Sequence, residues 1–195
     1  VISWVQAGEW NEAADFFAKL DNKNLQVETL KSELEQKIEE MIKRNKKRAH
    51  FMERLNALLQ EYNSGAHDID QLFDDLVELA RDLSEEEQRA IKENLSEEEL
   101  AIFDLLLKEN INPDETKRVR EVAKELLTKL KSEKLVLDWR EKESTRAGVK
   151  TAIFDLLYAE LPEPSYNEKD CEYMGVEVYN FIYEHYQDAS NFVGI

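Results

Sequence analysis

The sequence predicts an all-α protein, a multi-helix bundle with a long amino-terminal helix and a terminal helix with two apolar faces. Apolar residues recur with the helical period of 3.6 along most of the 195 residues. Three prolines and five glycines interrupt the chain, so long elements joined by short loops are expected. The alternation typical of a strand extends no further than Leu135–Leu137.

The first expected helix runs from about residue 25 to Ser64, and Gly65 supplies a residue suited to ending it. Its apolar stripe contains Leu34, Ile38, Met41, Ala49, Met52, Leu55, Leu59 and Tyr62. Between Met41 and Ala49 the stripe holds Asn45 alone. One continuous helix, or two helices separated near the basic residues 43–48, are therefore both open.

Later helix starts are indicated by capping boxes, in which a capping residue is followed three positions later by Glu or Gln. They begin at Asp68, Ser84, Ser96, Asn112 and Asp138. Pro113 strengthens the Asn112 site, because its missing N–H costs nothing at the first helical position. We expect the helix from Asp138 to end at Leu161, before Pro162. Gly148 inside that helix is interpreted as a mark of close helix packing.

The last helix is expected to start near Asn167 and carries apolar residues on two faces. The first face holds Cys171, Met174, Val178 and Phe181, and the second holds Val176, Tyr179, Tyr183 and Tyr186. Such a helix is either deeply buried or half-buried with its second face offered to a partner. We divide the chain into a lead-in with the long helix, residues 1–64, and a carboxy-terminal helical bundle, residues 65–195.

Charge is segregated along the sequence. The net charge is −17, yet residues 117–150 hold eleven Lys and Arg against six Asp and Glu. Residues 43–48 are basic and contain no acid, whereas residues 66–115 carry seventeen acids against four bases. Clustered like charges produce a lasting field, so these segments suggest a polyanion or an acidic partner.

The sequence contains no recognisable motif of the usual catalytic sites. The glycine-rich phosphate loops are absent, and His50, His67 and His185 lack the spacing that places two metal ligands on one helical turn. We expect no metal and no cofactor in this chain. Cys171 is the single cysteine, which fits a reducing cytoplasm, and no apolar run is long enough to span a bilayer. Because the chain starts at Val1 without an initiator methionine, we interpret it as a piece of a longer polypeptide.

Basic residues at helical spacing form three candidate DNA-binding groups. These are Lys43 and Lys47 in the first helix, Lys117, Arg120 and Lys124 in the second basic segment, and Lys142, Arg146 and Lys150 at every fourth residue. Three interpretations stay open: a solvated or internally paired face, nucleic acid, and an acidic protein partner. Any DNA contact would be to the backbone and independent of sequence, because Trp139 alone offers an aromatic ring among the basic residues.

Four stretches taken together resemble a known family: Leu95–Asp104, Val122–Leu127, Leu137–Lys150, and Leu161–Pro162 followed by the tyrosine-rich helix to Tyr186. In that order and spacing they are similar to the carboxy-terminal helical domain of the restriction subunit of type I restriction-modification enzymes. Asp138 and Trp139, followed by Arg146 and Lys150, are the most specific part. The resemblance covers roughly residues 52–186, and the residues before Lys47 match no motif of the family.

The resemblance implies a non-catalytic docking role. In that family the parent subunit carries a nuclease domain and two motor domains that use ATP and Mg²⁺ to translocate DNA, and their motifs are not found here. The partners implied are the methyltransferase core subunits and duplex DNA, in the cytoplasm. Trp139, Tyr179, Tyr183 and Tyr186 are the candidate partner contacts, with core filling as the alternative. A free-standing helical adaptor without a nucleic-acid role is the alternative function.

Overall fold

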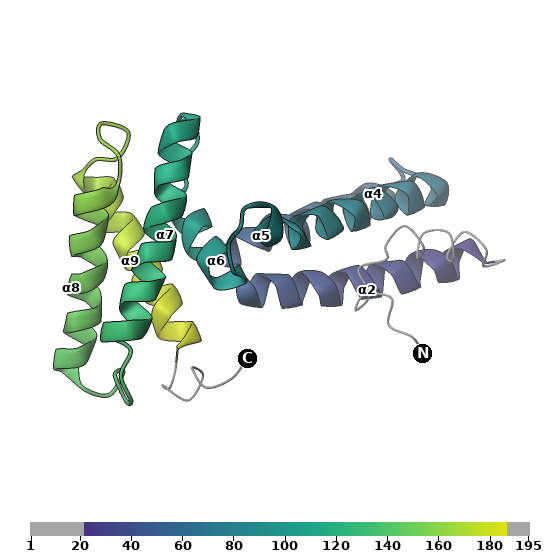
Figure 1. Ribbon diagram of the computed structural model, residues 1–195. Coiled ribbons are helices and arrows are strands. Elements are labelled where there is room, and N and C mark those ends of the chain that lie inside the picture. The colour runs from purple at the N-terminus through teal and green to yellow at the C-terminus, as the bar shows by residue number, and fades with distance from the viewer. Residues whose placement is uncertain (1–21, 187–195) are drawn as a thin grey trace. The chain divides into compact units, whose positions relative to one another are not determined.

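The structure, a computed structural model, describes residues 22–186 and confirms the all-α fold (Figure 1). Every regular element within this range is helical. The chain divides into two units, with the boundary between Glu97 and Glu98. We describe each unit by itself.

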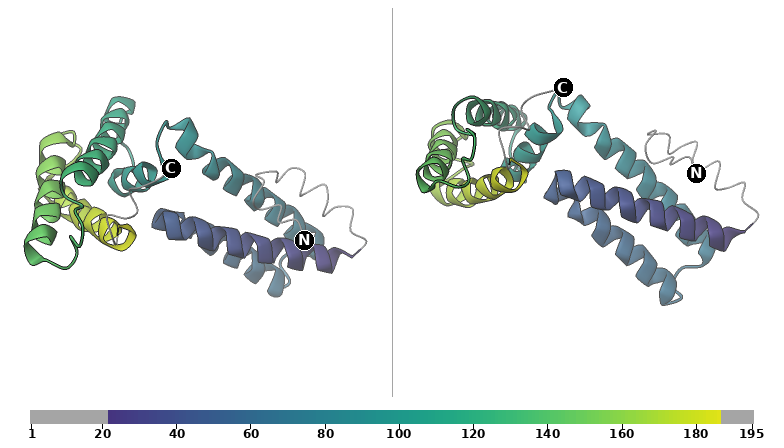
Figure 2. Two further views of the ribbon diagram at one scale, coloured as in Figure 1. Left: turned by 60° about the horizontal axis from the view of Figure 1, so that its bottom comes forward. Right: turned by 90° about the horizontal axis from the view of Figure 1, so that it is seen from below.

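The first unit contains α2 (Lys23–Arg44), the short 3-10 helix η2 (Lys46–Arg48), α3 (Ala49–Asn63), α4 (Ile69–Glu87) and α5 (Arg89–Lys92). α2, α3 and α4 pack pairwise, as the two views of Figure 2 show. Their shared core is aliphatic and includes Leu34, Ile38, Met41, Leu55 and Leu76. This packing joins α4 to the helices before it, so the unit extends beyond residue 64, where the sequence suggested a division.

The basic cluster interrupts the first helix. Asn45 has an extended backbone, and its side chain accepts a hydrogen bond from the Lys47 N–H at 3.0 Å. Arg48, three residues later, is buried and donates to Glu86 at 2.9 Å and to Glu97 at 2.8 Å. Two helices therefore occupy the range 25–64, because the chain turns at Asn45 to bring the Arg48 guanidinium to these carboxylates.

Of the five predicted capping boxes, those at Asp68, Ser96 and Asn112 lie at the starts of helices. Asp68 forms the predicted box with Gln71 at the start of α4, and Gly65 just before it has a positive φ of 77°. α6 begins directly after Ser96. The prediction at Ser84 is wrong, because the apolar stripe of α4 continues through Leu83 and the helix runs on to Glu87.

The second unit contains most of α6 (Glu97–Leu106), then α7 (Pro113–Glu133), α8 (Glu143–Glu160) and α9 (Glu168–His185). α8 packs against both α7 and α9, and the three helices lie side by side in Figure 1. The predicted capping box of Asn112 and Glu115 opens α7, with Pro113 at its first position. Asn167 opens α9 as expected, in a box completed by Asp170.

The prediction of a helix from Asp138 is wrong at its start. Asp138 has a φ of 56°, residues 137–141 form turns, and α8 begins at Glu143. Trp139 lies in this turn and is fully buried. Gly148 also differs from expectation, because a Cβ added there would meet no atom within 4 Å.

The two predicted apolar faces of α9 differ in how far they are buried. The first face, with Cys171, Met174, Val178 and Phe181, is buried in the core of the second unit. The second face is mixed, since Tyr186 is buried, Tyr179 and Tyr183 are half-buried, and Val176 is exposed. Between residues 22 and 186, none of the helices combines the length and apolar character that a membrane span requires.

Candidate functional site

An aromatic cluster lies between the α7–α8 turn and the end of α9. Trp139 is fully buried, and its indole N–H donates to the Tyr186 carbonyl at 2.8 Å. The rings of Tyr179 and Tyr183 meet the indole edge-on, with centroid distances of 6.5 and 5.9 Å. Edge-to-face contacts at this range add to the stabilisation from burial alone. The structure thus brings together the four aromatic residues that the sequence analysis named as candidate partner contacts.

The turn that carries Trp139 is fixed by hydrogen bonds from α8. The Thr145 hydroxyl donates to the Trp139 carbonyl at 2.6 Å. The Arg146 guanidinium donates to the carbonyls of Arg140 and Glu141 at 2.6 and 3.0 Å. Arg146 is therefore engaged in holding the turn, although the sequence suggested it as a DNA-binding residue.

Two of the candidate partner contacts, Trp139 and Tyr186, are buried. Trp139 and Tyr186 lie in the interior of the second unit, so in this conformation neither presents a surface to a partner. Burial, with a smaller effect from the Glu98 carboxylate, raises the pKa of Tyr186. The core-filling alternative describes these two residues. Tyr179 and Tyr183 keep part of their surface accessible.

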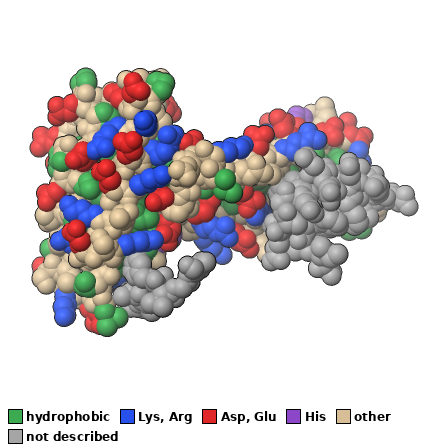
Figure 3. All heavy atoms as spheres, in the orientation of Figure 1, with side chains coloured by type: hydrophobic (Ala, Val, Ile, Leu, Met, Phe, Trp, Pro, Cys, Tyr) green, Lys and Arg blue, Asp and Glu red, His purple; other side chains and the backbone are tan. Residues whose placement is uncertain are grey.

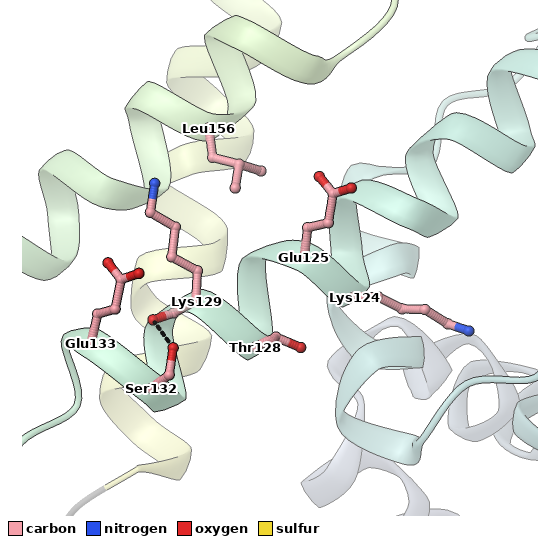
Figure 4. Close-up of a pocket in the computed structure, with 7 residues that line it drawn as sticks. All are labelled: Lys124, Glu125, Thr128, Lys129, Ser132, Glu133 and Leu156. Atoms are coloured by element: carbon pink, nitrogen blue, oxygen red, sulfur yellow. Dashed lines mark hydrogen bonds between the residues drawn. The ribbon is translucent and has the colours of Figure 1, made fainter.

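The α7 ridge of basic residues lies on the side of α7 that meets α6. The Arg120 guanidinium lies 5.6 Å from the centre of the Phe103 ring of α6, and Lys131 forms an ion pair with Glu98. Lys124 points away from α8, whereas Lys129 points towards α8 (Figure 4). Lys117 is exposed near the start of the helix. The ridge therefore borders α6 and not α8.

The α8 ridge lies on the opposite side, towards α9. Lys142 and Lys150 are exposed, and the Lys150 ammonium is 5.8 Å from the centre of the Phe154 ring. That ring in turn lies against Gly175 of α9, where an added Cβ would be 2.8 Å from the nearest ring carbon. The two ridges therefore meet different neighbouring helices, since Arg120 and Lys131 border α6 and Lys150 borders α9.

Lys43 and Lys47 are exposed in the first unit, at the end of α2 and in η2. On the face visible in Figure 3, Lys and Arg side chains are interspersed with Asp and Glu. Other cations are paired with carboxylates: Arg54 with Glu78 and Asp82, and Arg118 with Glu121, Glu125 and Glu160. Intermixed signs weaken the long-range field that the segregated sequence suggested.

A surface pocket of about 510 Å³ lies along α7, lined by Lys124, Glu125, Thr128, Lys129, Ser132, Glu133 and, from α8, Leu156 (Figure 4). Its walls carry both signs of charge, and the Ser132 hydroxyl donates to the Lys129 carbonyl at 3.3 Å. Within residues 22–186, the structure contains no group of three or more His, Cys, Asp or Glu side chains placed to hold a metal ion.

Sequence reasoning named Val176 on the second face of the last helix but missed Phe154, Tyr158 and Gly175 on the α8–α9 face. Tyr158 and Val176 are exposed there, and Phe154 and Gly175 form the close contact between the helices. Gly175 was the available signal, because a glycine within an otherwise apolar helix often marks the close approach of another group.

Comparison with known proteins identifies the family. The family model described as type I restriction enzyme HindI endonuclease subunit-like, C-terminal, matches residues 11–173. The match begins well before residue 52, where the resemblance was expected to start. A putative type I restriction enzyme MjaIXP endonuclease subunit of Methanocaldococcus jannaschii is 30% identical over 111 residues, which cover 56% of this chain and 11% of the relative. The chain thus aligns with about a tenth of that relative's length.

No solved structure matches the chain. The family model nevertheless spans both helical units and covers more than half of the sequence. The chain therefore belongs to the family of type I restriction enzyme HindI endonuclease subunit-like C-terminal regions.

Proposed function

We propose that this chain is a non-catalytic carboxy-terminal region of a type I restriction endonuclease subunit, and that it assembles the ATP-dependent translocase and endonuclease onto the methyltransferase core. The family match over residues 11–173 carries the proposal, because it assigns the chain to the C-terminal region of such a subunit. The hydrogen bonds from Thr145 and Arg146 that hold the α7–α8 turn also support the proposal. A docking surface benefits from side chains that are already ordered before binding.

The docking half of the proposal is tested by direct binding. The chain is mixed with the purified methyltransferase core of the same restriction system, and the mass of the eluting species is measured by light scattering during size-exclusion chromatography. We expect a species whose mass equals that of the core plus the chain. Separate elution at micromolar concentrations of both would contradict the docking role.

The proposal includes a sequence-independent contact with the DNA backbone. Lys117, Lys142 and Lys150 are exposed, and none of them has an ion pair with a carboxylate within the described part of the chain. Each phosphate contact releases counterions, so affinity falls with salt by about 0.9 logarithmic units per contact for each tenfold rise in salt. Because Arg146 is engaged with turn carbonyls, the α8 ridge offers two exposed lysines, and we expect one ridge acting at a time to give a salt slope of about −2.

Electrophoretic mobility of duplex DNA measures this contact. Binding should be present at low salt, be equal for unrelated duplexes, and disappear at moderate salt. Unchanged mobility at low salt with excess chain would remove DNA contact from the proposal. If the methyltransferase core also failed to bind, a free-standing helical adaptor would be the better description.

A further inference from the structure

The outer face of α8 and α9 carries an aromatic strip, which we define as Phe154, Tyr158, Val176, Tyr179 and Tyr183. The rings of Phe154 and Tyr158 are 6.3 Å apart on α8, and those of Tyr179 and Tyr183 are 6.1 Å apart on α9. The contact of Phe154 with Gly175 joins the two halves. Val176, Tyr179 and Tyr183 share one side of α9, because they are spaced three and four residues apart.

Two members of the strip are exposed, Tyr158 near the end of α8 and Val176 in the middle of α9. Tyr158 is 46% exposed and Val176 is 44% exposed. The other three members are half-buried, so their rings are partly accessible at the surface. Adjoining apolar groups left at the surface of a folded unit are typical of protein interaction sites.

Charges of opposite sign lie at the two ends of the strip. The Arg140 guanidinium stacks on the Tyr183 ring at 4.1 Å, and Lys150 lies beside Phe154, so this end is cationic. Near Tyr158, at the other end, are Glu168 and Glu172. Partial burial, and then these two carboxylates, raise the pKa of the Tyr158 hydroxyl.

We infer that the strip binds one amphipathic helix of the methyltransferase core, with acidic residues at the Arg140 end and basic residues at the Glu172 end. Glu172 and Tyr183 are about 16 Å apart along α9, because a helix rises 1.5 Å per residue. The bound helix therefore needs about three turns of apolar residues between its charged ends. A nucleic acid fits less well, because Glu168 and Glu172 would repel its phosphates.

The inference rests on the proposed function, and variants of the strip test it separately. Val176→Glu places a charge in the strip, whereas Ile91→Glu places the same charge on an apolar residue of α5 in the first unit, where Ile91 is 82% exposed. Affinity for the purified methyltransferase core is measured by biolayer interferometry with the full chain. We expect Val176→Glu to weaken binding at least tenfold and Ile91→Glu to change it less than twofold.

Two further variants examine the chemistry of the bound helix. Lys150→Glu should weaken binding several-fold, with the largest loss at low salt, because it reverses the charge at the cationic end. Tyr158→Lys tests the strip through α8 and replaces Val176→Glu if that variant unfolds, as judged by circular dichroism. Val176→Ile should retain full affinity, since it keeps the apolar surface.

The outcomes separate the inference from the proposed function. Wild-type chain that binds the core, with Val176→Glu and Tyr158→Lys both binding equally well, overturns the inference and leaves the docking role standing. Wild-type chain that does not bind the core overturns both. Loss of duplex DNA binding, or of self-association, in Val176→Glu with intact core binding would assign the strip to another occupant and also overturn the inference.

Discussion

Trp139 is a core residue in this structure, so the loss in the free energy of unfolding on its replacement can be predicted. The side chain is fully buried, and its N–H donates to the Tyr186 carbonyl at 2.8 Å. Replacing a buried tryptophan with alanine costs about 3–5 kcal/mol. Trp139→Phe retains most of the apolar contact but leaves the Tyr186 carbonyl without its donor, which costs about 1–3 kcal/mol. We therefore expect losses of about 4 and about 2 kcal/mol.

Hydrogen exchange followed by mass spectrometry is the appropriate measurement, because a chain of two units need not unfold in one step. Amides of α9 that open with the whole unit should report both losses, while amides of α2 and α4 serve as an internal reference. A cost below about 1 kcal/mol for Trp139→Ala would refute the reasoning, because the truncation of a fully buried tryptophan typically costs about 3–5 kcal/mol.

Four further variants test other parts of the structure. Gly148→Ala should raise the free energy of unfolding by about 0.5–1 kcal/mol, because its Cβ meets open space and alanine favours the helix; Gly175→Ala must displace the Phe154 ring, so equal gains in thermal unfolding would contradict the packing. Arg48→Met should cost on the order of 3 kcal/mol in urea unfolding, because it leaves carboxylates without their buried partner; a neutral result would refute the ion-pair account. Burial raises the pKa of Tyr166 to about 12. The folded state then keeps a proton that the unfolded state loses above about pH 10, so stability falls between about pH 10 and 12 by up to about 1.4 kcal/mol per pH unit. Between pH 9 and 11, Tyr166→Phe should lose about 1 kcal/mol less than the wild type, and an equal loss would contradict this assignment.

Helix type and several helix starts were predictable because their causes are local. Asp68 and Asn112 each meet their partner three residues later, and that contact needs no other part of the chain. Ser84 and Asp138 carry the same pattern, but the predicted helix starts at these two residues were wrong. Apolar packing extends α4 past Ser84, and burial of Trp139 holds the chain in a turn after Asp138. Tertiary contacts decided both cases, and a capping pattern does not contain them.

The candidate surfaces were predictable as ridges but not as faces of the folded unit. Spacing correctly places Arg146 and Lys150 on one helix, with Lys142 as the residue just before it. It does not show that Arg146 binds turn carbonyls or that Lys150 borders α9. The side of a helix that meets a neighbour depends on contacts between residues far apart in sequence. For the same reason Tyr158, an isolated tyrosine in the sequence, became part of the aromatic strip only when α9 was packed beside it.

The central claim is that this chain fastens the endonuclease subunit to the methyltransferase core, and a competition experiment tests it most directly. Complete restriction enzyme is assembled in the presence of a large excess of the free chain, and ATP-dependent DNA cleavage and DNA methylation are both measured. Our account predicts that cleavage falls as the free chain rises while methylation is unchanged, because the chain displaces the endonuclease subunit from the core. Cleavage that stays constant at a hundredfold molar excess of folded chain would contradict the account.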